Sequence, residues 1–219
     1  MTEKPDTSRD ERETVFIVDD DESIREGVSN LLEAVGINAK CYATAEGFCA
    51  HWSDAKAGCL LLDARLPGIS GVEFQERLRT SGARIPVIFM TAHGDIPMVR
   101  KVMKAGAVEF LTKPFQREEL LHAVEQAFAS DRARRTEKAI LDSIRARIDS
   151  LSPREQEVMA MVIAGFTNKD IAERLHLSIV TIKLHRGQVM RKMQADSLAD
   201  LVKMSERISP ARSAGNGVL

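Results

Sequence analysis

The fold of the N-terminal half is decided by residues 15–21, which read VFIVDDD. Four apolar residues rich in β-formers predict a strand that is buried on both faces, as strands of a parallel sheet are. Residues 59–63 repeat the pattern as CLLLD, and residues 23–34 between them carry apolar side chains at helical spacing. The repeating unit is therefore a buried strand with an acidic end, followed by a helix.

The same alternation continues to about residue 130. We predict further strands at 39–42, 86–90 and 108–111. We also predict a helix over about 45–52, a helix that follows the Pro-Gly loop and ends at about 79, a helix over 95–105 and a helix from 117 onward. Five strands alternating with five helices predict an α/β domain, in which a doubly wound parallel sheet is covered by helices on both faces.

Polar residues stand where four of these strands end: Asp19 and Asp20, Asp63, Thr91, and Lys113. Ligands of a doubly wound sheet bind beyond the carboxyl ends of its strands, so we expect one shared site. Converging carboxylates raise each other's pKa unless a cation joins them, and Mg²⁺ prefers oxygen ligands. Because a hydroxyl and an ammonium group suit phosphoryl oxygens, Asp63 is the expected nucleophile of an aspartyl phosphate.

Each of these residues alone also has a purely structural interpretation. An Asp at a strand end is often the N-cap of the next helix, and a Lys-Pro pair is usually a surface turn. The joint placement of all of them at strand ends favours the shared site, because perturbed groups cluster at functional sites.

Four motifs resemble the signature of two-component receiver domains: VDDD at 18–21, LDARLPG at 62–68, MTAH at 90–93 and LTKPF at 111–115. The resemblance covers residues 15–130 and implies the receiver fold, with a five-stranded sheet of order 2-1-3-4-5. It implies that Asp63 is the phosphate acceptor. It also implies that Asp20 and Asp63 bind Mg²⁺ directly with the backbone carbonyl of Arg65, and that Asp19 acts through water.

The resemblance assigns roles on the last two strands as well. Thr91 and Lys113 would contact the phosphoryl group, and Phe110 matches the switch aromatic of the family. His93 is expected either to affect how long the phosphate lasts or to be an exposed loop residue.

Residues 131–149 are predicted to form a helical linker. Residues 131–139 are charged and lack Gly and Pro, and Ile140, Ile144 and Ile148 then continue the four-residue apolar step of the preceding helix. This step is also the pattern of a helix–helix dimer seam, and the alternative is a flexible charged tether. The predicted division is a disordered tail at 1–14, a receiver domain at 15–130, the linker, a second domain at 150–208 and a disordered tail at 209–219.

The second domain is predicted to contain short helices only. Ser152 begins a capping box with Pro153 at the first helical position, and Gly165 ends that helix. Asn168 is expected to cap the next helix and Ser178 the third, and a fourth runs from about 198 to 208. The two central helices predict a small all-α helix-turn-helix domain, although the turn between them lacks a glycine.

The third of these helices is basic, which suits contacts with phosphates and with base edges in the major groove. The motifs LSPRE at 151–155, GFTNK at 165–169 and TIK at 181–183 resemble the LuxR-type DNA-binding domain of FixJ-like response regulators. The DNA contacts implied are Asn168, Lys169, Ser178, Val180, Thr181, Lys183, Leu184, Arg186 and Arg191. The fourth helix would form the dimer contact of the DNA-bound state through Leu198, Leu201 and Val202.

Two positions depart from the pattern of that family. Val180 is apolar where a polar residue is common, and it either touches a thymine methyl group or is simply exposed. Gly187 leaves no side chain at an expected groove-facing position. Direct readout would then rest on Val180, Lys183 and Leu184.

Composition excludes several classes of protein. Of 219 residues, 44% are hydrophobic, and 31 basic residues balance 32 acidic ones, which argues against disorder of the whole chain. No apolar run approaches the roughly 18 residues of a membrane span, and residues 1–14 do not resemble a secretory signal. We therefore expect a cytoplasmic protein without a membrane partner, and its three cysteines are expected to be buried free thiols.

Charge differs between the two halves of the chain. Residues 15–130 hold 12 basic and 16 acidic residues, whereas residues 151–219 hold 10 and 7. The acidic half suits a cation or a phosphate-transfer site, and the basic half suits nucleic acid.

The first functional hypothesis is a phosphorylation-controlled transcription factor rather than an enzyme. A sensor histidine kinase would phosphorylate Asp63 with Mg²⁺ as the cofactor, drawing Thr91 inward with Phe110 behind it. The face formed by the fourth helix, fifth strand and fifth helix would then build a homodimer or release the second domain. Two such domains would bind a two-fold operator in double-stranded DNA. RNA polymerase is a further expected partner, and activation is an analogy with relatives.

Three alternatives are weighed against this hypothesis. A phosphohydrolase of the haloacid-dehalogenase kind needs a second Asp two residues after its nucleophile, where Arg65 stands. A dinucleotide-binding enzyme needs a glycine-rich turn after the first strand, where residues 19–21 are all Asp. The third alternative is a receiver whose second domain binds proteins instead of DNA.

Overall fold

The structure, a computed structural model, describes residues 13–92 and 96–208 of the chain. The chain forms two compact units, and the boundary between them lies between residues 135 and 136. Strands and helices alternate in the first unit, whereas the described part of the second unit contains helices alone.

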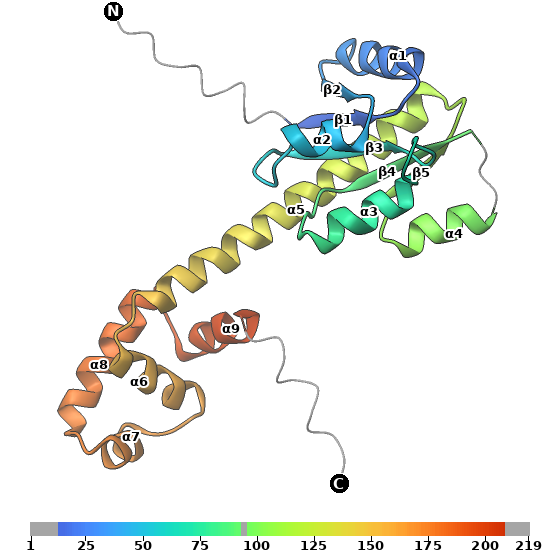
Figure 1. Cartoon of the computed structure of the whole chain (residues 1–219). Helices are drawn as coiled ribbons and strands as arrows, with labels where there is room; N and C mark the ends of the chain where they lie inside the picture. The colour runs from blue at the N-terminus through green and yellow to red at the C-terminus, as the bar shows by residue number, and fades with distance from the viewer. Residues whose placement is uncertain (1–12, 93–95, 209–219) are drawn as a thin grey trace, which may run out of the picture. The chain divides into compact units, whose positions relative to one another are not determined.

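A five-stranded parallel sheet with the order β2-β1-β3-β4-β5 forms the centre of the first unit (Figure 1). Its strands are β1 (Thr14–Val18), β2 (Asn38–Tyr42), β3 (Gly58–Asp63), β4 (Val87–Thr91) and β5 (Glu109–Thr112). The predicted fold class and strand order are therefore confirmed. Every residue of β1, β3 and β4 is buried, as their near-continuous apolar sequences predict.

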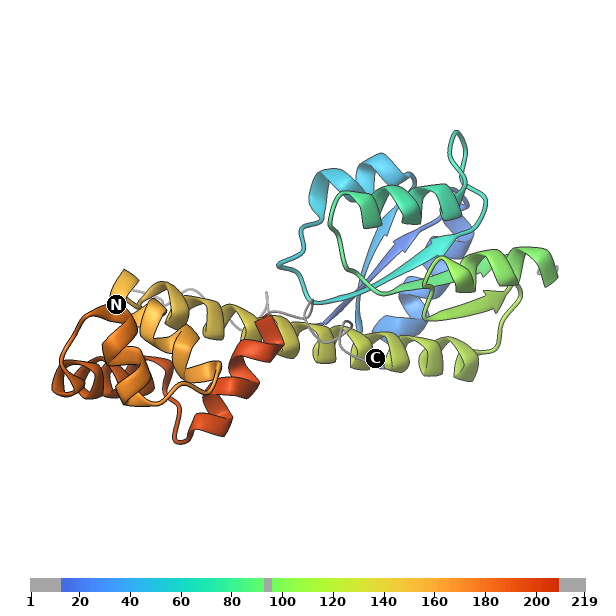
Figure 2. The same cartoon turned by 90° about the horizontal axis from the view of Figure 1, so that it is seen from below.

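Helices cover both faces of this sheet. Figure 2 shows α2 (Ala45–His51) and α3 (Gly71–Thr80) on one side and α5 (Arg117–Asp149) on the other. Helix α4 (Ile96–Lys104) packs with α2 and α3, and α1 (Glu22–Glu33) packs with α5. Successive side chains of a strand point to opposite faces, so Phe16 enters the first core and Ile17 the second.

Helix α5 is continuous over 33 residues, which makes the predicted linker helical throughout. Its stretch around Asp131 belongs to the first unit, and the Asp131 carboxylate accepts the backbone N–H of Gly58 there. Farther along, Ile144 is buried in the core of the second unit, and Ile140 and Ile148 pack against it. The apolar residues spaced four apart in the linker thus pack within their own chain.

In the described part of the second unit, four further helices pack with the end of α5 around one core, which includes Val158, Ile171, Ile182, Val189 and Leu201. These helices are α6 (Pro153–Ile163), α7 (Asn168–Leu175), α8 (Ile179–Met193) and α9 (Leu198–Ile208). The predicted capping box at Ser152 and the Ser178 cap are both present.

The predicted cap of α7 was wrong, because Thr167 and not Asn168 is the N-cap residue. The Thr167 hydroxyl accepts the N–H of Asp170, and the Asp170 carboxylate accepts the N–H of Thr167. This reciprocal pair satisfies two backbone donors, and Asn168 becomes the first helical residue.

The turn between α7 and α8 is tight even though it lacks a glycine. His176 takes the left-handed conformation, with φ of 52°, and ends α7. Ala172 and Ile182 are buried where the two helices meet. The pair α7–α8 therefore has the predicted helix-turn-helix arrangement.

The expectation of three buried thiols was wrong for two of them. Cys59 is buried in the central strand β3, whereas Cys41 on edge strand β2 and Cys49 on α2 are exposed. Only one face of an edge strand or a surface helix meets the core, so a short apolar run does not decide burial there. None of the helices in the described ranges combines the length and the apolar character that a membrane span requires. The predicted disordered tail at 1–14 was wrong for its last two residues, because Thr14 begins β1 and Glu13 forms an ion pair with Arg132. The rest of that tail, the tail at 209–219 and the His93 prediction lie outside the described residues.

Candidate functional site

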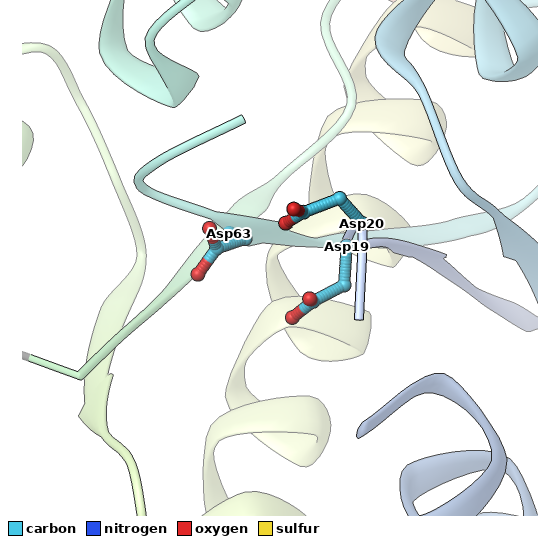
Figure 3. Close-up of side chains that lie close together, drawn as sticks. All are labelled: Asp19, Asp20 and Asp63. Carbon is cyan, nitrogen blue, oxygen red and sulfur yellow. The ribbon is translucent and has the colours of Figure 1, made fainter. Parts of the chain in front are cut away.

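Three carboxylates meet at the carboxyl ends of β1 and β3. The two strands are neighbours, with Val18 paired to Leu62, so the residues that follow are brought side by side. Carboxylate oxygens of Asp19, Asp20 and Asp63 all lie within 4.8 Å of one another, and Figure 3 shows the three side chains entering one region. Asp19 and Asp63 are buried, whereas Asp20 is exposed.

Lys113 brings a positive charge to this cluster from the end of β5. Its Nζ atom lies 2.5 Å from an Asp19 oxygen and 2.9 Å from an Asp63 oxygen. Burial lowers the pKa of Lys113, but the bonds and charges of the two carboxylates outweigh that effect and raise the pKa above its usual value. Lys113 is therefore an ammonium at neutral pH.

The charge balance and the donor atoms of this site fit a divalent cation. One ammonium against three carboxylates leaves two negative charges, and burial raises the pKa of Asp19 in spite of its bond to Lys113. Oxygen donors at this spacing are the ligands that hard divalent cations take. The three carboxylates could therefore hold such an ion.

The Asp63 carboxylate is held by backbone as well as by Lys113. The N–H of Arg65 donates to one Asp63 oxygen at 2.9 Å. Gly71 lets α3 begin close to this strand end, because a Cβ there would lie 2.3 Å from the Asp63 carbonyl oxygen. The loop between β3 and α3 is thus shaped around the predicted acceptor.

The three consecutive Asp residues after β1 differ in their contacts. Asp21 is the N-cap of α1 and accepts the N–H of Ser23, so the structural interpretation of a strand-end Asp holds for this one. Arg25 donates to the backbone carbonyls of Asp19 and Asp20 at 2.9 Å. Arg25 is not among the predicted site residues, although its place in the first turns of the following helix is a usable signal.

Thr91 lies on β4, the neighbour of β3, and Phe110 lies on β5, the next strand of the sheet. Thr91 ends β4 and is buried one residue beyond Met90, the register partner of Asp63. The backbone N–H of Lys113 donates to the Thr91 carbonyl at 2.7 Å. Phe110 is half-buried on β5 and pairs in register with Phe89.

The predicted DNA contacts lie on α7, α8 and the turn between them. Those that are exposed are Lys169, Ser178, Val180, Lys183, Leu184 and Arg191. Asn168, Thr181 and Arg186 are half-buried. The Arg186 guanidinium donates to the Asn168 carbonyl oxygen at 3.1 Å, so two of the predicted contacts are bonded to each other. Ile179 is also exposed at the start of α8 and was missed, because an isolated isoleucine suggests core.

The predicted dimer contact on α9 needs one correction. Leu201 is fully buried in the core of its own unit, so its side chain is not available to a second chain. Leu198 is 40% exposed and Val202 is half-buried. The apolar periodicity of α9 does not by itself distinguish its core face from its outer face.

The fold and the acidic strand-end site define an α/β domain of the doubly wound class, here joined to a helix-turn-helix unit. Residues 15–125 match the family "Response regulator receiver domain", and residues 149–205 match "Bacterial regulatory proteins, luxR family". The chain therefore belongs to the response regulators that combine a receiver with a LuxR-type DNA-binding domain. It is FixJ-like, and it is a transcription regulator of a two-component system.

Relatives match along nearly the whole chain. Nodulation protein W of Bradyrhizobium diazoefficiens is 45% identical over 194 residues, which cover 89% of this chain and 86% of the relative. Transcriptional regulatory protein FixJ of Rhizobium meliloti is 42% identical over 192 residues, covering 88% and 94%. The solved structure of response regulator StyR is 45% identical with a TM-score of 0.81, covering 90% of this chain and 99% of StyR.

Proposed function

We propose that a sensor histidine kinase phosphorylates Asp63, and that this modification in the cytoplasm controls the binding of DNA by the second domain. The observation that carries the proposal is the arrangement of Lys113, which contacts both Asp19 and Asp63 beside Asp20. The matched receiver family supports it, because its members receive signals from kinases.

The proposed reaction transfers a phosphoryl group from a phosphohistidine of the kinase. An Asp63 oxygen attacks the phosphorus, the phosphorus–nitrogen bond breaks, and the imidazole leaves with the bonding electrons and takes up a proton. The Arg65 N–H orients one Asp63 oxygen, and the Lys113 ammonium balances negative charge as the acyl phosphate forms. The chain itself therefore supplies the nucleophile and one of the positive charges.

We assign the metal of this site to Mg²⁺. Asp20 and Asp63 would hold it with the backbone carbonyl of Arg65, and Asp19 would act through a water molecule. When bound, the ion supplies charge neutralisation to the phosphoryl oxygens. Together with Lys113, such an ion would explain why the buried Asp19 carboxylate is tolerated at the strand end, since a carboxylate is costly to bury without nearby positive charge.

The change after phosphorylation is proposed to run through Thr91 and Phe110. The Thr91 hydroxyl would bond to a phosphoryl oxygen, and the half-buried Phe110 ring would then pack farther inward. The surface of α4, β5 and α5 would form a homodimer in that state. A bias of a few kcal/mol between two existing conformations is enough for such a switch.

In the dimer, two second domains would bind a two-fold operator with α8 in the major groove. The exposed Lys169, Lys183 and Arg191 would contact phosphates or base edges, and Leu198 with Val202 would touch the partner domain. We propose RNA polymerase as a further partner and activation as the outcome. The domains are assigned to residues 15–130 and 150–208, with 131–149 as the linker.

The test uses phosphoryl labelling of the full chain. Asp63→Asn should abolish label transfer from a phosphorylated histidine kinase or from acetyl phosphate, because the amide is a poor nucleophile. EDTA should abolish labelling of the wild type, and the matched variant Asp142→Asn, at an exposed site on α5, should label normally. Labelling of Asp63→Asn at the wild-type rate would refute the assignment.

A further inference from the structure

Helix α8 exposes a pair of aliphatic side chains one turn apart. Val180 is 77% exposed and Leu184 is 63% exposed, the largest values for large apolar side chains among the residues described. Residues four apart lie on the same face of a helix, so the two side chains form one apolar surface, the Val180–Leu184 pair. Single exposed aliphatic residues need no explanation, but an adjacent pair on this helix does.

The surroundings of the Val180–Leu184 pair suit an anionic partner. The α8 sequence contains Lys183, Arg186, Arg191 and Lys192 and no Asp or Glu. One turn beyond Leu184, a Cβ added at Gly187 would meet no atom within 4 Å, so this face stays open toward a partner. Lys183 is the exposed cation beside the pair.

We propose that the Val180–Leu184 pair determines sequence specificity by contacting thymine C5-methyl groups in the operator. The inference rests on DNA binding by this domain. In the major groove the methyl group is the apolar mark of a T·A pair, and apolar side chains read it by contact. Residues four apart are separated by about 6 Å along a helix, which corresponds to nearly two base-pair steps of about 3.4 Å.

The proposal specifies what kind of operator this chain prefers. Each half-site should carry two thymines, on either strand, within about two or three base pairs of each other. Direct readout of the bases would come mainly from methyl contacts and would include few specific hydrogen bonds, because Lys183 is the one long polar side chain between Val180 and Leu184. A partner protein with an apolar surface is the competing occupant of the same pair.

The experiment selects high-affinity duplexes from a random pool with the full chain treated with acetyl phosphate and Mg²⁺. Thymines of the selected half-site are then replaced one at a time by deoxyuridine, which removes the methyl group and keeps all hydrogen bonds. Each of two replacements should weaken binding about fourfold, the value for one buried methyl-sized group. Val180→Ala should bind the thymine and deoxyuridine duplexes equally at one position, and Leu184→Ala at the other.

The control variant is Val35→Ala, which shortens a valine that is 37% exposed on the first unit and should keep full discrimination. Half-sites without thymine, equal affinity for deoxyuridine duplexes, or intact discrimination in both α8 variants would each overturn the proposal. Failure to select any duplex at low salt would instead overturn DNA binding itself. That result would favour the protein-binding alternative.

Discussion

Replacing Asp131 with Ala should destabilise the first unit strongly. Asp131 is 1% exposed and accepts hydrogen bonds from three donor groups: the Gly58 N–H at 3.0 Å, and the Arg134 and Arg135 guanidinium groups at 2.6 Å each. We call these four residues the Asp131 cluster. It joins α5 to the start of β3, at the opposite end of that strand from Asp63.

The size of the effect follows from what the substitution leaves behind. The buried Gly58 N–H would lose its acceptor, which costs about 1–3 kcal/mol. Removing one partner of a buried ion pair costs about 3–5 kcal/mol. Arg135 keeps bonds to the carbonyls of Ala55 and Lys56, and Arg134 keeps Asp54. These remaining partners reduce the loss, so we expect about 3 kcal/mol.

The assay is urea denaturation followed by the emission of Trp52. It is the single tryptophan of the chain, and its ring stacks on Phe48 in the core of the first unit at 5.5 Å. The signal therefore reports the first unit even when the second unfolds separately. At a slope of about 2 kcal/mol per molar urea, the midpoint should fall by about 1.5 M.

The control for this prediction is Glu73→Ala, which breaks an exposed ion pair with Arg77 in the same unit. Exposed pairs of this kind contribute about 0–1 kcal/mol, so its midpoint should move by less than about 0.5 M. A shift for Asp131→Ala no larger than the control shift would refute the reasoning.

Three further predictions address pH, backbone and DNA. Burial raises the pKa of Asp131, but bonds from Arg135, Gly58 and Arg134 outweigh that effect and hold the pKa below the ordinary 3.8. The ionised carboxylate therefore stabilises the folded state above that pH, and this stabilisation is lost as the pH falls below it. The stability gap between wild type and Asp131→Asn should accordingly narrow below about pH 3.8 in the Trp52 assay, and a constant gap down to about pH 2.5 would contradict this. Gly58→Ala should lower the free energy of unfolding by at least about 3 kcal/mol, because the new Cβ would lie 1.9 Å from the Thr14 carbonyl oxygen at a φ of +145°. The matched variant Gly82→Ala has a φ of +88° but no atom within 4 Å of its Cβ, so it should lower the free energy of unfolding by about 1 kcal/mol. Lys183→Ala should weaken DNA binding and reduce the salt slope by about one in an anisotropy titration, and unchanged values would remove Lys183 from the interface.

The fold and the acidic site could be predicted because both depend on short stretches. An apolar run such as residues 15–18 buries both faces of a strand, and the position of Asp19 is then fixed by where that run ends. Parallel strands place their carboxyl ends at one edge, so Asp63 and Lys113 reach the same edge without any knowledge of the intervening loops.

Contacts that depend on distant segments or on the outer face of a helix could not be predicted. Gly58 and Asp131 are 73 positions apart, and neither shows by itself that it will meet the other. Leu201 and Leu198 follow one apolar pattern on α9, yet one is in the core and the other is exposed. Such outcomes are decided by which neighbour a face meets, which amphipathic spacing alone leaves open.

The Asp131 cluster limits how a signal can leave the proposed phosphoacceptor site. Strand β3 carries Asp63 at one end and Gly58 at the other, and all of its residues are buried, so α5 is bonded to the same strand that bears the acceptor. A rigid tilt of α5 against β3 would break the bond from Gly58 to Asp131 and the bonds that Arg134 and Arg135 make to residues 54–56. At about 1 kcal/mol for each bond, the cost is several kcal/mol, which is as large as the whole bias of a typical switch. Strand β5 is less constrained, because Glu109 and Phe110 on it are half-buried at the edge of the sheet. We therefore expect phosphorylation to reshape β5 and α4 while α5 keeps its attachment to β3.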